Sequence, residues 1–305
     1  MLTHAYEDSA MLDHKNGPKG SSDPEDIRIV PLRHWGRWFS AGLMLVILAA
    51  MSQSFVTNPR FRWDMVAQYM FDHAILQGLV KTIWLTVAAM GIGTVLGTVL
   101  AVMRISHNPV LSSFSAGYAW LFRGTPLLVQ LIFWYNLAAL YPVINVTIPF
   151  GPTLFSFDAN DYITVYVAAL LGLSLNEGAY MSEIVRSGLN AVPPGQREAA
   201  EALGMSSRRI LFRIILPQAM RVILPPAGNQ LIGMLKTTSL VSVIAMQELL
   251  YSAQLIYQTN FQPVPLLIVA SIWYLALTTV LSVLQFFIER RFAKGHVRTA
   301  TKAAA

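Results

Sequence analysis

The chain has 305 residues, of which 54% are hydrophobic and only 12% are charged, and its mean hydropathy is +0.50. Soluble domains carry about 25% charged residues, so this composition excludes an ordinary soluble domain and indicates a membrane protein. The absence of cysteine excludes disulfides and cysteine-based metal sites, and the net charge of +6 is distributed in a way that predicts membrane orientation and no nucleic-acid partner.

The N-terminal part of the chain changes from polar to apolar near residue 38. Residues 1–37 are polar and of mixed charge, which predicts a disordered cytoplasmic tail. Trp38 to Phe55 is apolar and just exceeds the minimum of about 17 residues for a membrane span. We therefore expect a first transmembrane helix with an outer segment, together covering 38–75.

Five further apolar runs follow, separated by polar or Pro- and Gly-containing segments. They are Gln77–Met103, Leu111–Leu140, Tyr162–Leu189, Gln218–Leu250 and Pro265–Ile288. A polar outer loop is expected over Tyr251–Pro263, and a basic cytoplasmic tail over 292–305. The predicted fold is an all-α polytopic membrane protein with about six transmembrane helices.

Basic residues are distributed unevenly between the two sides of these spans. With the N-terminus inside, 17 of the 22 Lys and Arg residues fall in inner segments, and only Arg60, Arg62 and Lys81 fall outside. This asymmetry predicts that both termini are cytoplasmic. It also places the charged stretch 193–217 on the cytoplasmic side.

Three groups of polar residues interrupt the apolar runs. Arg123 precedes Gly124 and Thr125, Asn176 and Glu177 lie in mid-run, and Lys236 is followed by Ser239. Charges at bilayer depth cost at least about 2.5 kcal/mol and usually mark a functional path. The Gly and Pro after Arg123 predict a helix break whose freed backbone groups face a cavity.

Two interpretations of these charges remain open. Arg123 and Glu177 could form a structural ion pair with each other or with Lys236. Alternatively, an arginine that binds a carboxylate and a glutamate that binds an ammonium together match a zwitterionic amino acid.

The stretch 193–217 predicts a helix, a hinge and a second helix. Pro193 and Pro194 suit a helix start, Gly204 suits a left-handed stop, Ser206 can cap the next helix and Pro217 is expected to end it. A solvated cytoplasmic loop is the alternative. An apolar face of Ala199, Ala200, Ala202 and Leu203 at its tip instead predicts docking into the groove of another protein.

The same residues resemble the "EAA" coupling loop of ABC importer permeases. Glu198-Ala199-Ala200 is followed by three residues, Gly204, nine residues, Ile214, one residue and Leu216-Pro217. The resemblance implies that an ATPase subunit docks here and that the coupling residues are Glu198, Ala199, Ala200, Leu203, Gly204, Leu216 and Pro217.

From about Gly78 to Arg291 the chain also resembles the polar amino acid permeases of that class. The matching segments are Phe122–Leu127, Asn176–Tyr180 with Glu183 and Arg186, and Lys236–Leu240, in which Thr237 departs from the family pattern. The resemblance implies a five-helix permease core over 76–291 and an additional N-terminal helix. The substrate path would then contain Arg123, Gly124, Thr125, Asn176, Glu177, Lys236 and Ser239.

The family also implies partners that this chain needs. No GxxxxGK[ST] or HExxH motif is found, so we expect no catalytic residues, no metal site and no cofactor in this chain, with ATP and Mg²⁺ bound by a separate ATPase subunit. An external binding protein would deliver the amino acid, and a second permease copy or a homologous permease would complete the path. The expected location is the bacterial inner membrane, among its lipids.

Other functions compete with this interpretation. An ion-coupled secondary transporter would use Glu177 as its coupling carboxylate, but it would need inverted repeats, which the sequence lacks, and it leaves 193–217 unexplained. A membrane-embedded enzyme lacks any catalytic signature. Within ABC importers, another ligand class such as a sugar remains open.

Overall fold

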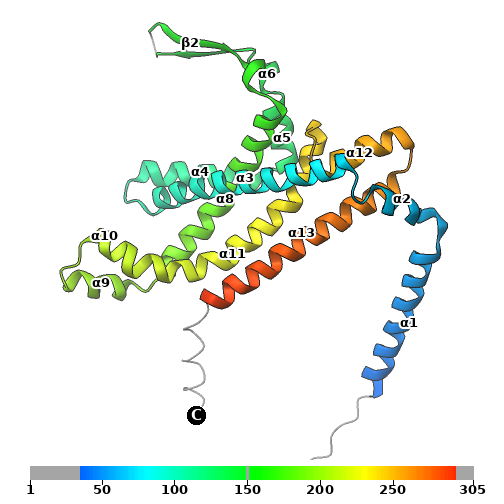
Figure 1. Cartoon of the computed structure of the whole chain (residues 1–305). Coiled ribbons are helices and arrows are strands. Elements are labelled where there is room, and N and C mark those ends of the chain that lie inside the picture. Colours follow the sequence, from blue (N-terminus) through cyan, green and yellow to red (C-terminus); the bar gives the residue numbers. More distant parts are fainter. Residues whose placement is uncertain (1–34, 149–150, 293–305) are drawn as a thin grey trace, which may run out of the picture. The chain divides into compact units, whose positions relative to one another are not determined.

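The computed structural model describes residues 35–148 and 151–292, and the chain forms two units, Met1–Asn58 and Pro59–Ala305 (Figure 1). The predicted tails, 1–37 and 292–305, lie almost entirely outside the described residues. The first unit contains one described helix, α1 (Trp35–Thr57), none of whose side chains is buried within the chain. Its 23 residues are long and apolar enough to cross a membrane, and it covers the run for which the first span was predicted.

The second unit is mostly helical, and its elements follow in the order below. Helices precede a single hairpin: the 3-10 turn η2 (Pro59–Phe61), α2 (Trp63–Tyr69), α3 (His73–Ile105), α4 (Pro109–Gly124), α5 (Leu127–Tyr135), α6 (Leu137–Leu140), β1 (Val143–Thr147) and β2 (Thr153–Asp158). Helices again follow it: α7 (Ala159–Tyr162), α8 (Val165–Asn190), α9 (Pro194–Ala202), α10 (Ser207–Ile210), the π-helical turn η3 (Leu211–Ile215), α11 (Leu216–Thr237), the 3-10 turn η4 (Thr238–Ile244), α12 (Leu249–Asn260) and α13 (Pro263–Phe292).

Four stretches in the described part of the chain are long and apolar enough to cross a membrane. They are α1, α3, the stretch Ser207–Ile244 and α13. The run predicted over Leu111–Leu140 is instead divided into α4, α5 and α6, and α8 carries too many polar residues to qualify. The all-helical membrane fold is confirmed, while the count of about six spans stays a prediction.

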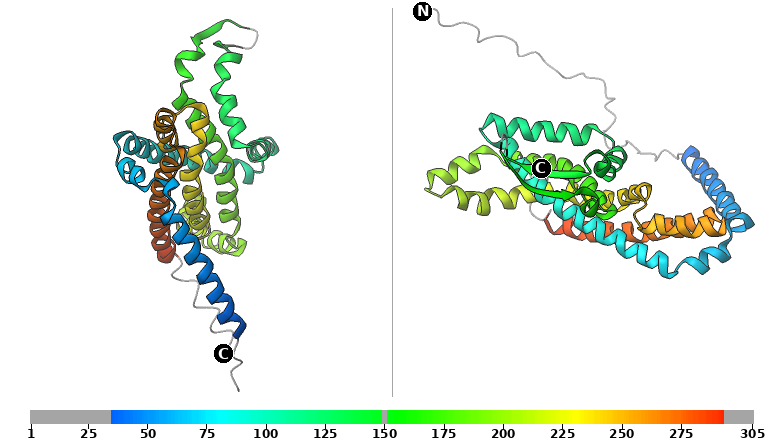
Figure 2. Two further views of the ribbon diagram at one scale, coloured as in Figure 1. Left: turned by 90° about the vertical axis from the view of Figure 1, so that its right-hand side faces the viewer. Right: turned by 90° about the horizontal axis from the view of Figure 1, so that it is seen from above.

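The most extensive packing in the second unit, which Figure 2 shows from two further sides, joins α3 to α8. The two helices cross while running in the same direction, because Gly93 lies against Glu177 and Gly97 against Met181. Gly97 of α3 allows this approach, because a Cβ there would lie 2.5 Å from Met181 Cβ, 2.8 Å from the Ser182 nitrogen and 2.9 Å from the Gly178 oxygen. Two of these atoms belong to the backbone of α8 and cannot rotate away. A small residue at position 97 is therefore what permits the close approach of α3 and α8.

Replacing Gly97 by valine should separate α3 from α8 and lower the yield of folded protein. We expect a destabilisation of about 1–3 kcal/mol or more, since the added methyl groups overpack a rigid contact. Gly91→Val is the matched control, because nothing lies within 4 Å of a Cβ at Gly91 in the same helix. Thermal unfolding of the purified protein should distinguish them, and equal melting temperatures would contradict this account.

Two segments between the predicted spans form regular secondary structure. The stretch after α6 forms the antiparallel hairpin β1–β2, which pairs Val143 with Asp158 and projects from the rest of its unit (Figure 1). The prediction of a polar loop over Tyr251–Pro263 is wrong, because α12 occupies most of it. Ser252 and Ala253 of α12 are fully buried, in contact with the cluster around Ile75 of α3 and Val269 of α13.

The short outer segment before α3 is anchored by polar contacts. The Arg62 guanidinium donates two hydrogen bonds of 3.2 and 3.3 Å to Asp64, and this hydrogen bonding lowers the pKa of the exposed Asp64 carboxyl below its ordinary value. Trp273 of α13 donates from Nε1 to the Met70 carbonyl at 2.8 Å. The hydrogen bond from Trp273, together with the packing of α2 on α13, holds the segment from Trp63 to Tyr69 against α13.

Candidate functional site

The stretch 193–217 contains the predicted helix and hinge. Helix α9 begins at Pro194, and its C-terminus is closed by hydrogen bonds from Gly204 N to the Glu201 oxygen and from Met205 N to the Ala200 oxygen. This is the Schellman arrangement, which needs a left-handed residue at the position after the cap. Gly204 supplies it with φ +71°.

The residues at the tip of this stretch divide into buried and exposed sets. Ala200 is 2% exposed and packs inward, where α9 contacts α10 and η3. Glu198 and Ala199 are exposed, and the Leu203 side chain is 81% exposed. An isolated leucine on an otherwise charged tip presents an apolar surface that is available to another protein.

The expectation that Pro217 ends the second helix is wrong. Leu216 and Pro217 begin α11, and the helix continues to Thr237. Pro217 lacks an N–H, and the π-helical turn before it changes the hydrogen-bond pattern, so that Leu216 N bonds to the Leu211 oxygen. A proline is tolerated in such a first turn. The stretch 193–217 is thus continuous with a helix that is long and apolar enough to cross a membrane.

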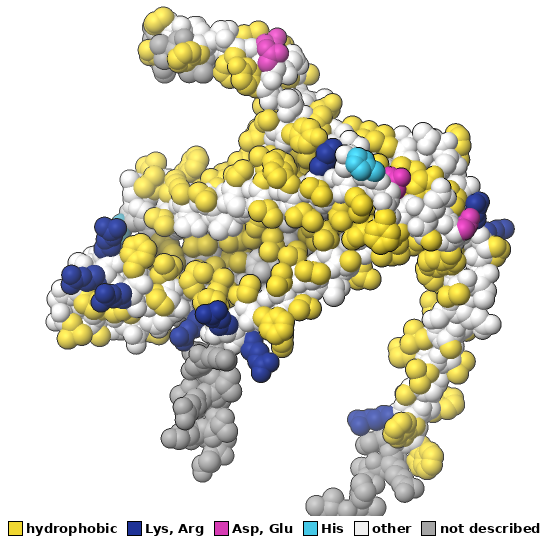
Figure 3. Space-filling view, viewed as in Figure 1, with side chains coloured by type: hydrophobic (Ala, Val, Ile, Leu, Met, Phe, Trp, Pro, Cys, Tyr) yellow, Lys and Arg dark blue, Asp and Glu magenta, His cyan; other side chains and the backbone are white. Residues whose placement is uncertain are grey.

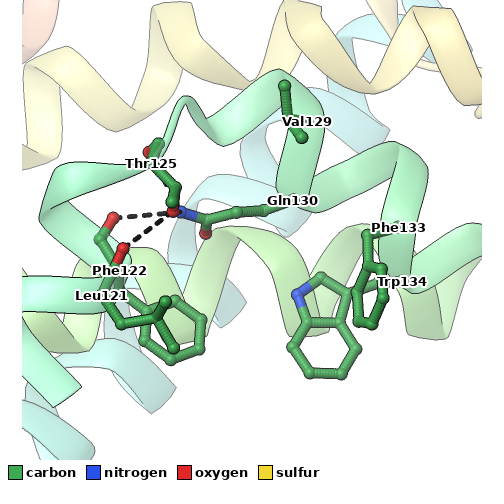
Figure 4. A pocket seen from close by; sticks show the side chains of 7 residues that line it. All are labelled: Leu121, Phe122, Thr125, Val129, Gln130, Phe133 and Trp134. Carbon is green, nitrogen blue, oxygen red and sulfur yellow. Dashed lines mark hydrogen bonds between the residues drawn. The ribbon is translucent and has the colours of Figure 1, made fainter. Parts of the chain in front are cut away.

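The predicted helix break lies between α4 and α5, at Gly124, Thr125 and Pro126. The carbonyl of Phe122 that the break frees is not left facing a cavity. It accepts hydrogen bonds from Gln130 Nε2 at 3.0 Å and from Asn176 Nδ2 at 2.8 Å (Figure 4 shows the first). Asn176 is therefore engaged in holding the broken helix against α8.

A hollow of about 370 Å³ adjoins this break. Its lining is mostly apolar, with Thr125 and Gln130 as the polar groups, and consists of Leu121, Phe122, Thr125, Val129, Gln130, Phe133 and Trp134 (Figure 4). Gln130 donates to Thr125 Oγ1 at 2.7 Å, and Thr125 Oγ1 donates to the Leu121 oxygen at 2.8 Å. Both polar groups are thus satisfied internally, so the hollow offers chiefly apolar contact.

Arg123 does not pair with Glu177, as one interpretation expected. Its Nη1 lies 3.8 Å from Glu183 Oε1, and its guanidinium lies over the Tyr180 ring at 5.5 Å from the centroid. Glu183 also accepts a 2.6 Å hydrogen bond from Arg186. The Arg123 side chain is 44% exposed, so it can reach a further anion.

Glu177 is in a different environment. It is 3% exposed, and its oxygens accept hydrogen bonds of 3.3 and 3.4 Å from Gln230 of α11. A Cβ added at Gly93 of α3 would lie only 2.7 Å from Glu177 Cβ and Cγ, so α3 packs directly against the aliphatic part of the Glu177 side chain. Within the described residues no cation is paired with it. A buried carboxylate held only by an amide is available to a cation that displaces Gln230.

The third polar group predicted from the sequence, Lys236 and Ser239, has few side-chain contacts. Lys236 is exposed near the C-terminal end of α11, and its backbone oxygen accepts a 2.7 Å hydrogen bond from Ser239. No group of three or more potential metal ligands occurs within 35–148 and 151–292.

Three side chains that organise these groups were not predicted from the sequence, namely Gln130, Glu183 as the partner of Arg123, and Gln230. A fourth polar side chain that was not predicted, Glu248, lies apart from these groups at the start of α12. Glu248 is fully buried and accepts hydrogen bonds from Leu250 N at 2.9 Å, Tyr251 N at 2.7 Å and Tyr274 Oη at 2.7 Å. A Glu placed directly before an apolar run was the available signal, because such a residue can cap a helix.

Comparisons with known proteins agree with this architecture. Residues 93–294 match the family model described as binding-protein-dependent transport system inner membrane component. The chain is 46% identical over 294 residues to the arginine transport system permease protein ArgU of Corynebacterium glutamicum, covering 95% of this chain and 91% of the relative. It is 38% identical over 230 residues to the L-cystine transport system permease protein TcyB of Bacillus subtilis, covering 75% of this chain and 90% of the relative.

A solved structure described as an amino acid ABC transporter with histidines matches with a TM-score of 0.60 and 35% identity. The match covers 72% of this chain and 94% of that one. These relatives are transport permeases, which supports an ABC permease over an ion-coupled transporter and over an enzyme. The chain belongs to the family of binding-protein-dependent transport system inner membrane components and is the permease subunit of an ABC importer.

Proposed function

We propose that this permease imports polar amino acids, with arginine as the leading candidate. The observation that carries the proposal is the presence of an exposed guanidinium at Arg123, next to the α4–α5 break, and of a buried carboxylate at Glu177 of α8 that has no cationic partner in the described chain. Arg123 would bind the substrate carboxylate, and Glu177 would bind the cationic side chain of arginine. The 46% identity to a permease named for arginine supports this choice.

The path would be completed by partners. We infer that two ATPase subunits, which bind ATP and Mg²⁺, dock on Glu198, Ala199 and Leu203, because these side chains are exposed at the tip of the coupling stretch. An external binding protein delivers the amino acid, and a second copy or a homologous permease forms the other half of the path. Lys and Arg gather near α9, α10 and the end of α13 on the face drawn in Figure 3, which supports a cytoplasmic location for that end.

Purification of the tagged chain in mild detergent tests the assembly. We expect an ATPase subunit and an amino-acid binding protein among the co-purifying proteins, identified by mass spectrometry. The ligand of that binding protein would name the substrate, and any second permease would identify the pairing. A chain that purifies alone under conditions that preserve complexes would contradict the proposal.

Glu177→Gln tests the substrate site. We expect roughly tenfold slower arginine uptake, since a hydrogen bond to a charged group contributes at least about 1.5 kcal/mol. Uptake of a neutral amino acid, measured in the same proteoliposomes, should fall less and serves as the internal control. If both substrates are carried at the original rate by intact complexes, Glu177 has only the structural role of binding Gln230.

A further inference from the structure

A second hollow, distinct from the one beside the helix break, lies between α11 and α13. It has a volume of about 300 Å³ and includes Met90 of α3 at its edge. Its walls are mostly apolar, with Leu224 and Leu231 from α11 and Leu284 and Ile288 from α13. Helices α3 and α13 and the stretch containing α11 are apolar enough to span the membrane, so the surrounding medium is acyl chain or protein.

At the polar end of this groove, hydrogen bonds of Gln285 fix how α11 and α13 lie against each other. Gln285 of α13 donates from Nε2 to the Pro225 carbonyl at 3.2 Å and to Asn229 Oδ1 at 3.1 Å. Helices α11 and α13 run in opposite directions (Figure 1). Gln285 also donates to Glu289 Oε1 at 2.6 Å. Toward the N-terminal part of α11 and the C-terminal end of α13, both helices continue beyond these contacts by at least one further turn, about 5.4 Å.

Two arginines extend the groove walls by that turn. Arg221 lies three residues before Leu224 and seven before Gly228, and Arg291 lies three residues after Ile288 and seven after Leu284. Residues spaced by three, four and seven share one face of a helix, so both arginines continue the lining toward the same end. Both are exposed, and neither has an ion pair within the described ranges.

We propose that this groove binds an anionic phospholipid, with an acyl chain against the apolar walls and the phosphate between Arg221 and Arg291. Charge complementarity selects this occupant, because an apolar groove between membrane helices that ends in two unpaired arginines matches a lipid with an anionic headgroup. Glu289 lies at the same end and repels a phosphate placed beside it, so the phosphate sits beyond it. The hydroxyl groups of a glycerol headgroup can donate to Glu289.

Titration of the assembled complex with phosphatidylglycerol, followed by native mass spectrometry, tests the proposal. An arginine near an anionic headgroup contributes about 1 kcal/mol, so Arg291→Gln should weaken binding about fivefold and the Arg221→Gln/Arg291→Gln pair about 25-fold. Arg290→Gln is the matched control, because it removes the same charge from the adjacent position, off the groove face. It should change the affinity less than twofold.

Two further measurements distinguish the contribution of the lipid headgroup from that of the apolar groove. Ala227→Phe, which places a ring in the hollow, should reduce binding of phosphatidylglycerol, and phosphatidylcholine should bind the unaltered complex more weakly than phosphatidylglycerol does. Excess inorganic phosphate should not displace the lipid, since the acyl chain carries much of the contact. The proposal is overturned if no lipid adduct forms, if Arg290→Gln acts like Arg291→Gln, or if Ala227→Phe has no effect.

Discussion

Replacing Gly204 by valine is expected to abolish transport while the protein remains inserted in the membrane. Gly204 has φ +71°, and this left-handed conformation costs an ordinary L-residue about 1–2 kcal/mol, with the highest cost for β-branched side chains. A Cβ at this position would have no atom within 4 Å, so the cost arises from the backbone alone. The turn would open, and α9 would lose its direction relative to α10 and α11.

Uptake by proteoliposomes that contain the ATPase and the binding protein measures this effect, together with ATP hydrolysis. We expect at least tenfold lower uptake for Gly204→Val, a smaller loss for Gly204→Asp, and the smallest for Gly204→Asn, because asparagine tolerates the left-handed region best. Gly195→Val in α9 is the matched control, since it also has open space but no positive φ. Wild-type uptake by Gly204→Val would show that the turn does not couple the two subunits.

Glu248→Ala should have the largest effect on stability. The carboxylate caps α12 through two backbone N–H groups and also accepts from Tyr274, and its position joins α12 to α13 and, through Thr82, to α3. Losing an N-cap costs about 0.5–2 kcal/mol, and leaving a buried hydroxyl without its partner adds about 1–3 kcal/mol. We expect a total of about 3 kcal/mol, or a melting temperature lowered by roughly 6–12 °C.

Conservative variants distinguish this network from simple loss of packing. Glu248→Gln keeps the side-chain volume and one acceptor oxygen, so it should lower the melting temperature less than alanine does. Tyr274→Phe should cost about 1 kcal/mol alone. It should cost little in the Glu248→Ala background, because the partner is already absent. Additive effects of the two substitutions would mean that the hydrogen bond between them contributes nothing.

Features that depend on neighbouring residues could be predicted from the chain alone. The spans α1, α3 and α13 follow from long apolar runs, and the α4–α5 break follows from Gly124 and Pro126. The left-handed turn after α9 follows from Gly204, since only glycine adopts it at low cost. In each case a few adjacent side chains decide the backbone conformation, so the local pattern is sufficient.

Features that depend on helix packing could not be predicted in this way. The partner of Arg123 is Glu183, 60 positions further on, and the partner of Glu177 is Gln230, 53 positions further on. Helix α12 resembles a loop in sequence because of its polar residues, yet one face of it is buried against α3 and α13. Which polar side chains meet is decided by how the helices pack and rotate about their axes, and this is a property of the tertiary structure alone.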